Sequence, residues 1–464
     1  MRRTLAFLTM VLLALGLGLI SGHPRTEFHL KNAYRAAERN GWIQVHLEGT
    51  PREIGFQHGY LLADEIQDNF DDIAAELLHD SKRDWSFYRK TAREVFWPRI
   101  EAEYRDELTG IAEGLKARRG RLDVWDLVAM NAWLELPYYT KTLEHKTGGT
   151  AEHCSAFVAT GSYTKDGRVV IGHNNWTSYS SGERWNMVFD IVPASGYRIL
   201  MDGMPGLIHS GDDFGLNSAG ILITETTISE FEGFDPAGVP EFVRARKAMQ
   251  YAASLDDFAR FMEGGNNGGY ANNWLVADRK TNEIGDLELG LKNVNFTRSK
   301  DGFFVGSNFP VDPKLMREET KFDPANKASS AIARRVRWLE LMEEYKGRID
   351  VAAGQRFLAD HFDSYEKKEA ASERTLCGHI EFSPRGMPTW QSAYAPAGAV
   401  QNKVTDAAGA ERMSFTAALG HACGRDFKAA AHLAEHPEYA WYQPILRDMD
   451  ARPWTEFQAS TAAK

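Results

Sequence analysis

The segment "GGTAEHCSAFVATG", residues 148–161, divides the chain into two parts with different sequence patterns. A run of small and polar residues ends at Cys154, and a β-like pattern begins there. Residues 24–146 carry apolar side chains at helical spacing, whereas strand-like runs follow Cys154. The sequence therefore predicts a mostly helical first third and an α+β body that begins with a thiol on a strand.

The body is predicted to contain consecutive antiparallel strands with helices packed on them. The Asp-Gly pair in "SYTKDG" separates "CSAFVATG" from "RVVIGHNNW" and indicates a hairpin. A second hairpin is predicted from "NNWLVADRKTNEIGDLELG", and further strands from "MVFDIVP", "YRILMDG" and "AGILITETTI". Helical spacing recurs in "FVRARKAMQYA", "LDDFARFMEG" and "SSAIARRVRWLELMEEYKG".

The composition is that of an acidic globular protein. The chain has 464 residues, of which 43% are hydrophobic, and its formal net charge is −10. An acidic chain lacks the basic surface that phosphate backbones require, so we expect no nucleic-acid partner. Nothing in the composition predicts an oligomeric state.

The N-terminus has the pattern of a signal peptide. Arg2 and Arg3 precede an apolar run over residues 5–20, and small residues follow at positions 21 and 22. The apolar run is short for a membrane span, although an uncleaved anchor is an alternative. We therefore expect an exported protein, periplasmic or secreted, or lysosomal if the source is eukaryotic.

The chain has three cysteines, Cys154, Cys377 and Cys423. At most one disulfide can form among them, which leaves one thiol that is either a small buried residue or a nucleophile. A thiol attacks as its thiolate, and a nucleophile at the start of a chain can use its own α-amine as the base. Cys154 gains that amine if its thiol attacks the carbonyl of His153 and the resulting ester is hydrolysed.

The motifs "HCSAFVATG", "IGHNNWTSY", "HSGDDFGLNSAGILITETTI", "NNWLVAD" and "SNFP" follow one another in the order seen in phospholipase B-like proteins. The chain thus resembles that family of N-terminal nucleophile (Ntn) hydrolases. Upstream, "GTPREIGFQHGYLLADEI" and "DELTGIAEGL" resemble the prosegment of the related acyl-CoA:6-aminopenicillanate acyltransferases. The resemblance implies an α+β fold, specifically a four-layer αββα sandwich, with the nucleophile at the end of a central strand.

The resemblance also implies how the chain is divided. After the signal peptide or anchor that the N-terminal pattern predicts, residues 1–22, the resemblance implies that residues 23–153 are a helical prosegment that stays bound after cleavage. Residues 154–464 are the catalytic body. The cleaved bond is the one between His153 and Cys154.

Carried over motif by motif, the resemblance implies a set of site residues. His173 and Trp176 in "HNNW" accompany the Cys154 nucleophile, and Arg334 binds a substrate carboxylate or places a charge near the thiol. The oxyanion donors come from the "ETTI" segment, as Thr226 or Thr227, and from the "YANNW" segment, as Asn272 or Asn273. The alternative is that these residues are strand, turn, loop and solvated helix positions without a catalytic role.

The implied reaction is hydrolysis of an acyl amide or ester through a thioester on Cys154, with no metal or organic cofactor. Phospholipids, N-acyl amides and peptides all fit as the acylated substrate. If an amine replaced water as the acceptor, the enzyme would be an acyltransferase. A further alternative is a non-catalytic protein that binds lipid or peptide with the same fold.

The segment "HLAEH", from His432 to His436, fits the His-x-x-Glu-His pattern of inverted zinc peptidases. A zinc site needs a third ligand in reach, and the 28 residues after His436 offer little to build one. No Gly-x-Ser-x-Gly elbow is present, which disfavours a serine α/β-hydrolase.

Overall fold

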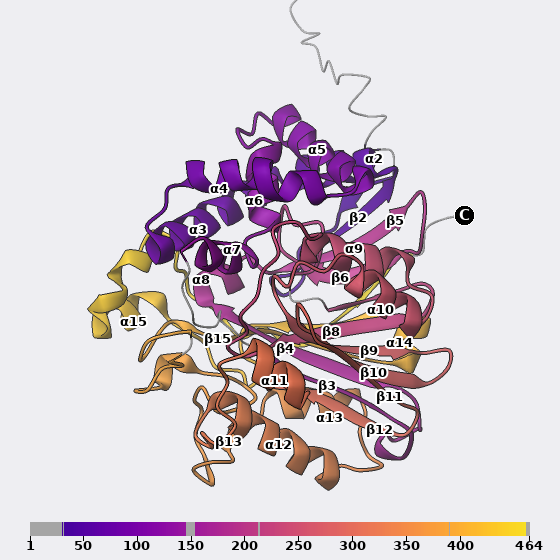
Figure 1. The fold of residues 1–464 in the computed structure, drawn as a ribbon, viewed down its shortest axis with the longest axis vertical. Coiled ribbons are helices and arrows are strands. Elements are labelled where there is room, and N and C mark those ends of the chain that lie inside the picture. The colour runs from indigo at the N-terminus through magenta and orange to yellow at the C-terminus, as the bar shows by residue number, and fades with distance from the viewer. Residues whose placement is uncertain (1–29, 31, 145–153, 212–213, 389, 461–464) are drawn as a thin grey trace, which may run out of the picture.

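The computed structural model describes residues 30, 32–144, 154–211, 214–388 and 390–460. Two large sheets form its centre, and helices cover the outer face of each sheet (Figure 1). The nine-stranded sheet has the order β1-β2-β5-β6-β7-β8-β9-β10-β11, and the six-stranded sheet has the order β12-β3-β4-β15-β16-β17. All neighbouring strands in both sheets are antiparallel except β2 and β5, which are parallel.

The strands have the following bounds. The nine-stranded sheet comprises β1 (Tyr34–Arg35), β2 (Ile43–Gly49), β5 (Met187–Pro193), β6 (Ile199–Gly203), β7 (Gly215–Asn217), β8 (Ile221–Thr227), β9 (Asn272–Asp278), β10 (Glu283–Leu289) and β11 (Val294–Ser299). The six-stranded sheet comprises β12 (Gly302–Gly306), β3 (Cys154–Thr160), β4 (Val170–Ser178), β15 (Ala397–Asp406), β16 (Ser414–Leu419) and β17 (Thr455–Gln458). A separate ribbon pairs β13 (Phe362–Asp363) with β14 (Lys368–Glu369).

The helices fall into three groups along the chain. Before β3 lie α2 (Pro51–Leu61), α3 (Ala63–Ser81), α4 (Trp85–Thr91), η1 (Ala92–Phe96), η2 (Trp97–Arg99), α5 (Ala102–Ala117), α6 (Val124–Asn131) and α7 (Leu136–Leu143). Between β3 and β12 lie η3 (Gly161–Tyr163), α8 (Tyr179–Gly182), α9 (Glu241–Tyr251) and α10 (Leu255–Glu263). After β12 lie α11 (Pro313–Glu319), α12 (Ser330–Glu344), α13 (Val351–Leu358), η4 (Ile380–Phe382), α14 (Ala407–Glu411), α15 (Ala429–Glu435) and η5 (Pro437–Tyr442).

The layers follow from where the apolar side chains are buried. One cluster packs β5, β8 and β9 against helices that include α2, α5 and α9, and a second fills the space between the two sheets. A third packs β3 and β4 against α12 and α13. Strand alternation explains this division, because Phe157 faces α12 while its neighbours Ala156 and Val158 face the other sheet. The order helix–sheet–sheet–helix confirms the predicted α+β, four-layer architecture.

Both predicted hairpins are confirmed. β3 and β4 pair antiparallel from Cys154–Asn175 to Ala159–Val170, and β9 pairs with β10 over seven residues. The predicted helical character of the first third is confirmed for α2 to α7, but that part also supplies β1 and β2. Since β2 is paired with β5 along its whole length, the N-terminal part shares a sheet and a core with the body.

Helices α2 and α5 approach each other unusually closely. A Cβ on Gly59 would lie 2.0 Å from the Ile111 carbonyl oxygen, and one on Gly114 would lie 2.2 Å from that of Phe56. Gly55 and Gly110 meet the facing backbone in the same way. The glycines of "REIGFQHGY" and "DELTGIAEGL" therefore form the contact between the two helices.

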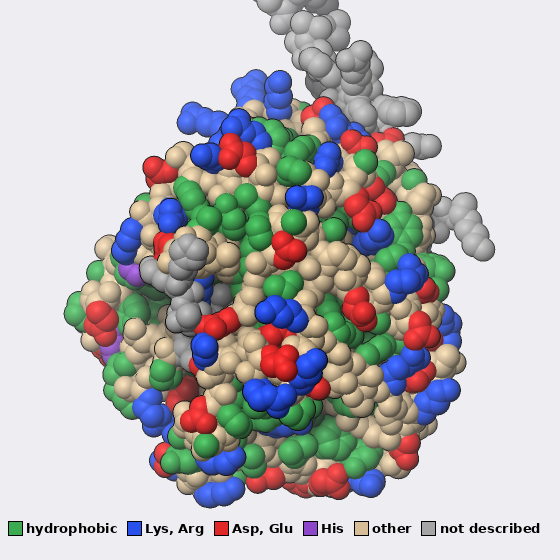
Figure 2. Space-filling model, in the orientation of Figure 1, with side chains coloured by type: hydrophobic (Ala, Val, Ile, Leu, Met, Phe, Trp, Pro, Cys, Tyr) green, Lys and Arg blue, Asp and Glu red, His purple; other side chains and the backbone are tan. Residues whose placement is uncertain are grey.

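The visible face of the molecule carries acidic and basic side chains interspersed among apolar ones (Figure 2). None of the described helices is both long and apolar enough to span a bilayer. The signal-peptide segment, residues 1–22, and His153 lie outside the described residues, so export and the 153/154 boundary remain predictions.

Candidate active site

Cys154 is the first residue of β3 and is almost completely buried, with 2% of its surface exposed. Its Sγ lies 3.9 Å from Oε1 of Glu225 at the end of β8. His173 lies on β4, opposite Ala156, and therefore on the same face of the sheet as Cys154. One ligand atom from each of Cys154, His173 and Glu225 lies within 4.8 Å of the others.

The backbone of Cys154 is held from both sides. Its N–H donates to Oδ1 of Asn308 at 3.2 Å, and its carbonyl accepts a hydrogen bond from Nη1 of Arg334. Arg334 also donates to Ser155 Oγ at 3.1 Å and to Asn308 Oδ1 at 2.8 Å, while its Nε donates to Ser330 Oγ at 2.9 Å. The guanidinium therefore braces the residue that carries the thiol.

Arg334 is completely buried, so the alternative of a solvated helix face is wrong for this residue. Its position on α12 places the guanidinium 4.5 Å from the centre of the Trp176 ring. Trp176 lies three residues beyond His173 on β4 and hence on the opposite face of the sheet. The structure thus places Trp176 against Arg334 rather than beside the thiol.

Two residues at the site have a left-handed backbone conformation. Asn308 has φ of 64° and donates through Nδ2 to the Thr227 carbonyl at 2.9 Å. Tyr270 has φ of 51°, and its hydroxyl donates to Glu225 Oε1 at 3.0 Å. Such conformations are uncommon for residues other than glycine and concentrate where function requires a fixed geometry.

The predicted oxyanion donors lie on two paired strand ends. Thr226 pairs with Asn273, and Thr227 pairs with Asn272. The Thr226 side chain meets β12, since a Cβ on Gly306 would lie 2.5 Å from its Oγ1. Successive side chains of a strand point to opposite faces of its sheet, and Asn272 and Asn273 therefore do so.

The two asparagines differ in their partners. Asn273 donates through Nδ2 to Asp286 Oδ1 at 3.4 Å. Burial raises the pKa of Asp286 to about 6, and this hydrogen bond opposes the shift. Asn272 is completely buried, and neither of its amide atoms has a hydrogen-bond partner among the described residues. Asn272 is therefore the amide that is available to a bound group.

A buried ion pair lies beside His173. Lys403 is the cross-strand neighbour of His173 on β15, and its Nζ lies 2.8 Å from Oδ2 of Asp202. Both charges are inaccessible to solvent, and Ser210 Oγ donates to the other oxygen of Asp202 at 2.7 Å. A paired and hydrogen-bonded ion pair of this kind fixes local geometry, because loss of either partner leaves a buried charge.

Three groups of side chains in the described part of the chain have the composition and spacing of metal ligands. One is Cys154, His173 and Glu225. The other two share His379 and lie around the segment after β14, with members His361, Cys377, His379, Glu381, His421 and Cys423. Neither His432 nor His436 belongs to these groups.

Glu225, Tyr270 and Asn308 lie at the site, although the sequence patterns single out none of them. Each lies in a motif that was recognised, namely "ETTI", "YANNW" and "SNFP". Their roles depend on which strands become neighbours, and that information is not present in the local pattern. His153 and the pair Asp212 and Asp213 of "GDDF" lie outside the described residues.

Comparison with known proteins places these motifs in a family. A family model described as phospholipase B matches residues 48–297, more than half of the chain. Phospholipase B-like 1 of Homo sapiens is 23% identical over 262 residues, which cover 49% of this chain and 47% of that protein. The family-model match thus includes α2 to α7, Cys154 and β9, which carries both asparagines.

Two further relatives are informative. An uncharacterized protein of Archaeoglobus fulgidus is 28% identical over 298 residues, covering 60% of this chain and 49% of that protein. The acyl-coenzyme A:6-aminopenicillanic-acid-acyltransferase 40 kDa form of Emericella nidulans is 25% identical over 230 residues, covering 48% of this chain and 57% of that protein. The chain spans about half the length of these relatives. The chain belongs to the phospholipase B family, as its motifs indicated.

Proposed function

We propose that the chain is an autoprocessing cysteine hydrolase that cleaves acyl amide or ester bonds through a thioester on Cys154. The observation that carries the proposal is the position of the thiol. It lies at the first residue of a buried strand, next to His173 and Glu225, and Asn308 and Arg334 hold its backbone. Family membership supports an acyl-transfer reaction of the Ntn type.

The maturation step is an intramolecular acyl shift. The Cys154 thiol loses its proton to His173 or Glu225 and attacks the His153 carbonyl, so that the peptide bond is replaced by a thioester. Water then hydrolyses the thioester, which leaves a carboxylate on His153 and a free amine on Cys154. Asn308 Oδ1, which accepts the peptide N–H at 3.2 Å, is placed to orient the new amine.

In the mature enzyme the α-amine of Cys154 acts as the general base. A free α-amine has a pKa of roughly 7.7–8.0, which suits proton transfer near neutrality. The thiolate attacks the acyl carbonyl, and an amide N–H from Asn272 or Asn273 stabilises the oxyanion together with a donor near Thr226 or Thr227. The ammonium returns its proton to the leaving group, and water hydrolyses the thioester.

The chemistry of the site fits acylated small molecules, including phospholipids, N-acyl amides and peptides. The prosegment would remain associated after cleavage, because β2 is part of the nine-stranded sheet. We propose that the protein acts outside the cytoplasm, as the pattern of residues 1–22 indicates.

A denaturing gel and intact-mass measurement test the maturation step. The 52.1 kDa chain should give two fragments, with Cys154 at the start of the larger one. The Cys154→Ala variant should stay intact and inactive, while a Lys116→Ala variant on the exposed side of α5 should be processed like the parent. An unprocessed parent that persists at mildly acidic pH would contradict the proposal.

The substrate is found by screening acyl amides, acyl amino acids and phospholipids with the parent and with Cys154→Ala. The relative from Emericella nidulans favours a second candidate, an acyltransferase that uses an amine as acceptor. Adding amines during turnover distinguishes the two, because a transferase forms an acylated amine in place of the free acid.

A further inference from the structure

A second cluster of nucleophilic side chains lies away from the Cys154 thiol. His361 precedes β13, Cys377 and His379 lie in the long connection after β14, and Cys423 follows β16. One ligand atom from each of the four lies within 4.8 Å of the other three. Three segments that are distant in the sequence therefore contribute two sulfur and two nitrogen ligands to one place.

The separations match those of a tetrahedral zinc site. Nε2 of His379 lies 3.5 Å from Sγ of Cys377 and 3.6 Å from Sγ of Cys423. Bonds of about 2.3 Å from zinc to sulfur and 2.0–2.1 Å to nitrogen place neighbouring ligand atoms about 3.5 Å apart at tetrahedral angles. The two separations from His379 thus fit the ligand spacing of a tetrahedral zinc site.

The ring of His379 is oriented as a metal ligand requires. Its Nδ1 lies 2.8 Å from Oε1 of Glu381, which fixes the tautomer and leaves Nε2 toward the sulfurs. Glu381 is held in turn by the hydroxyl of Tyr179, which donates to its other oxygen at 2.5 Å. A carboxylate behind a ligating histidine is the usual outer contact of zinc sites. Nε2 of His361 is buried and makes no hydrogen bond among the described residues.

His421 stacks on His379 with ring centroids 4.0 Å apart but is not a fifth ligand. Its Nε2 is within 3.0 Å of the Tyr179 hydroxyl, and its Nδ1 is within 3.1 Å of the Arg425 carbonyl. Both ring nitrogens are engaged, so the ligand set is two cysteines and two histidines.

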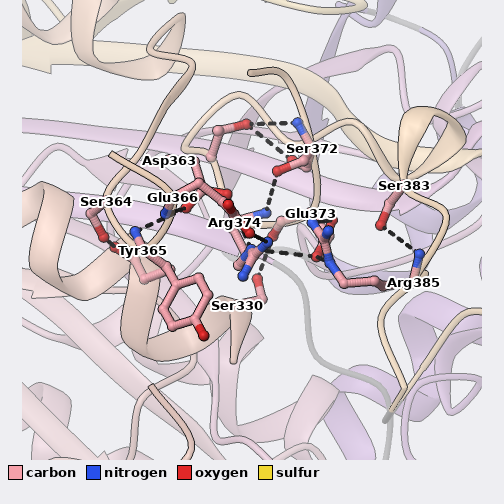
Figure 3. A network of polar contacts seen from close by, with 12 residues as sticks. Ser330, Asp363, Ser364, Tyr365, Glu366, Ser372, Glu373, Arg374, Ser383 and Arg385 are labelled. Carbon is pink, nitrogen blue, oxygen red and sulfur yellow. Dashed lines mark hydrogen bonds and ion pairs between the residues drawn. The ribbon is translucent and has the colours of Figure 1, made fainter. Parts of the chain in front are cut away.

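The segment that carries Cys377 and His379 has little regular structure to hold it. Among the described residues between β14 and β15, 370–388 and 390–396, η4 is the only helix or strand. One side of the segment is anchored by Arg374, which is 1% exposed and pairs with Asp363 at 3.1 Å and Glu366 at 3.0 Å (Figure 3). Cys377 and His379 follow Arg374 by three and five residues, so a metal there would fix the backbone directly beyond that anchor.

The same segment supports the candidate active site. Ser330 Oγ donates to the Glu373 carbonyl at 2.5 Å (Figure 3). The same oxygen accepts a hydrogen bond from Arg334. A Cβ on Gly378 would lie 2.2 Å from the Trp176 ring, so the backbone between Cys377 and His379 lies directly on that ring. Fixing this backbone would fix the indole against which Arg334 packs.

We propose that His361, Cys377, His379 and Cys423 bind one Zn²⁺ in a closed, tetrahedral, structural site. Both thiols bind as thiolates, and their two protons are released to solvent on binding. A set of two thiolates and two imidazoles is typical of zinc, and four protein ligands leave no position for water or substrate. A disulfide between Cys377 and Cys423 would join only two of the three segments and leave both imidazoles without a role.

Metal analysis of the purified full-length protein tests the proposal. The parent should contain one zinc per chain, and Cys377→Ser and Cys423→Ser should lose it. Two matched controls should retain it: His421→Gln, which changes the neighbouring imidazole, and Cys154→Ala, which removes the third thiol. Replacement of zinc by Co²⁺ should give the strong visible bands of tetrahedral cobalt and a sulfur-to-cobalt charge-transfer band, both absent in Cys377→Ser.

A measurement on the parent alone covers the case in which the cysteine variants do not fold. Treatment with a strong chelator should make two further thiols reactive and lower the unfolding temperature, and added zinc should reverse both effects. A parent without zinc and with a Cys377–Cys423 disulfide in its peptide map would overturn the proposal. So would loss of the metal in Cys154→Ala, since that places the ion at the other thiol.

Discussion

At the scale of single residues, the site depends on which hydrogen bonds each polar group has already made. Arg334 donates to the carbonyl of Cys154, to Ser155 and to Asn308, so its position on the helix supports the residue that carries the thiol. Asn272 is equally buried but has no partner among the described residues. A buried amide without a hydrogen bond is costly, and a bound oxyanion would satisfy the Asn272 N–H.

The two asparagines should therefore differ in catalysis. Asn272→Ala is expected to lower kcat by about 10²–10³-fold, the usual effect of removing one oxyanion donor. Asn273→Ala should have a smaller effect, since its amide already donates to Asp286. Steady-state kinetics on any acyl substrate found in the screen measures both, with thermal unfolding as the control for folding. A larger loss in Asn273→Ala would assign the oxyanion to the other face of β9.

At the scale of elements, the contact between α2 and α5 determines how the N-terminal part packs on the sheet. The two helices meet through glycines on both sides, and their backbones are too close to admit a Cβ. The N-terminus of α2 is fixed by a capping box between Thr50 and Glu53. Packing at this crossing therefore depends on small residues rather than on large apolar ones.

Gly59→Ala tests that contact, because helix propensity and steric overlap change the free energy of unfolding in opposite directions. Helix propensity alone would make alanine about 1 kcal/mol more favourable than glycine. The new Cβ would lie 2.0 Å from the Ile111 carbonyl oxygen, so the helices must separate, and we expect a net loss of about 1–3 kcal/mol. Denaturant unfolding measures the change. The exposed Lys116→Ala on α5 should stay within about 0.5 kcal/mol of the parent, and a stabilised Gly59→Ala would contradict the argument.

At the scale of the whole molecule, burial raises the pKa of several carboxyl groups. Burial raises the pKa of Glu288 to about 8, of Glu183 to about 7 and of Asp286 to about 6. Burial lowers the pKa of His58 to about 3. The folded chain thus holds protons on its buried carboxyls and excludes a proton from a buried imidazole.

These shifts predict a stability maximum at mildly acidic pH. A carboxyl with a raised pKa stabilises the fold below its ordinary value of about 4.5, and this contribution is lost as the pH rises toward 8. The imidazole of His58 stabilises the fold above its ordinary value of 6.5, and this contribution is lost as the pH falls toward 3. The unfolding temperature should therefore be highest between about pH 4.5 and 6.5.

Thermal unfolding across this range measures the profile. Glu288→Gln should reduce the fall in stability between pH 6.5 and 8, because the amide cannot titrate and can still accept one of the two backbone N–H bonds made to the carboxylate. A parent whose stability rises steadily from pH 6.5 to 8 would contradict the assignment of buried protonated carboxyls.

The sequence by itself indicated many of the elements and the family, and it singled out Cys154 as the proposed nucleophile. Strand alternation, the Asp-Gly turn and the ordered motifs depend only on local spacing, and they placed Cys154 and His173 on paired strands of an αββα sandwich. Strand β2 was missed although its seven residues make it as long as β3, because α2 begins only two residues after it ends. The predicted division into a prosegment and a catalytic body did not indicate that the two parts share one sheet.

Only the tertiary structure decided which side chains meet. Glu225 reaches the thiol, Asn308 and Arg334 hold its backbone, and four ligands from three segments form the proposed zinc site. None of these contacts has a local signature, because strand neighbours such as β8 and β9 or β3 and β12 are far apart in the chain. Local spacing fixes the face on which a side chain lies, whereas sheet order and layer packing fix what stands opposite it.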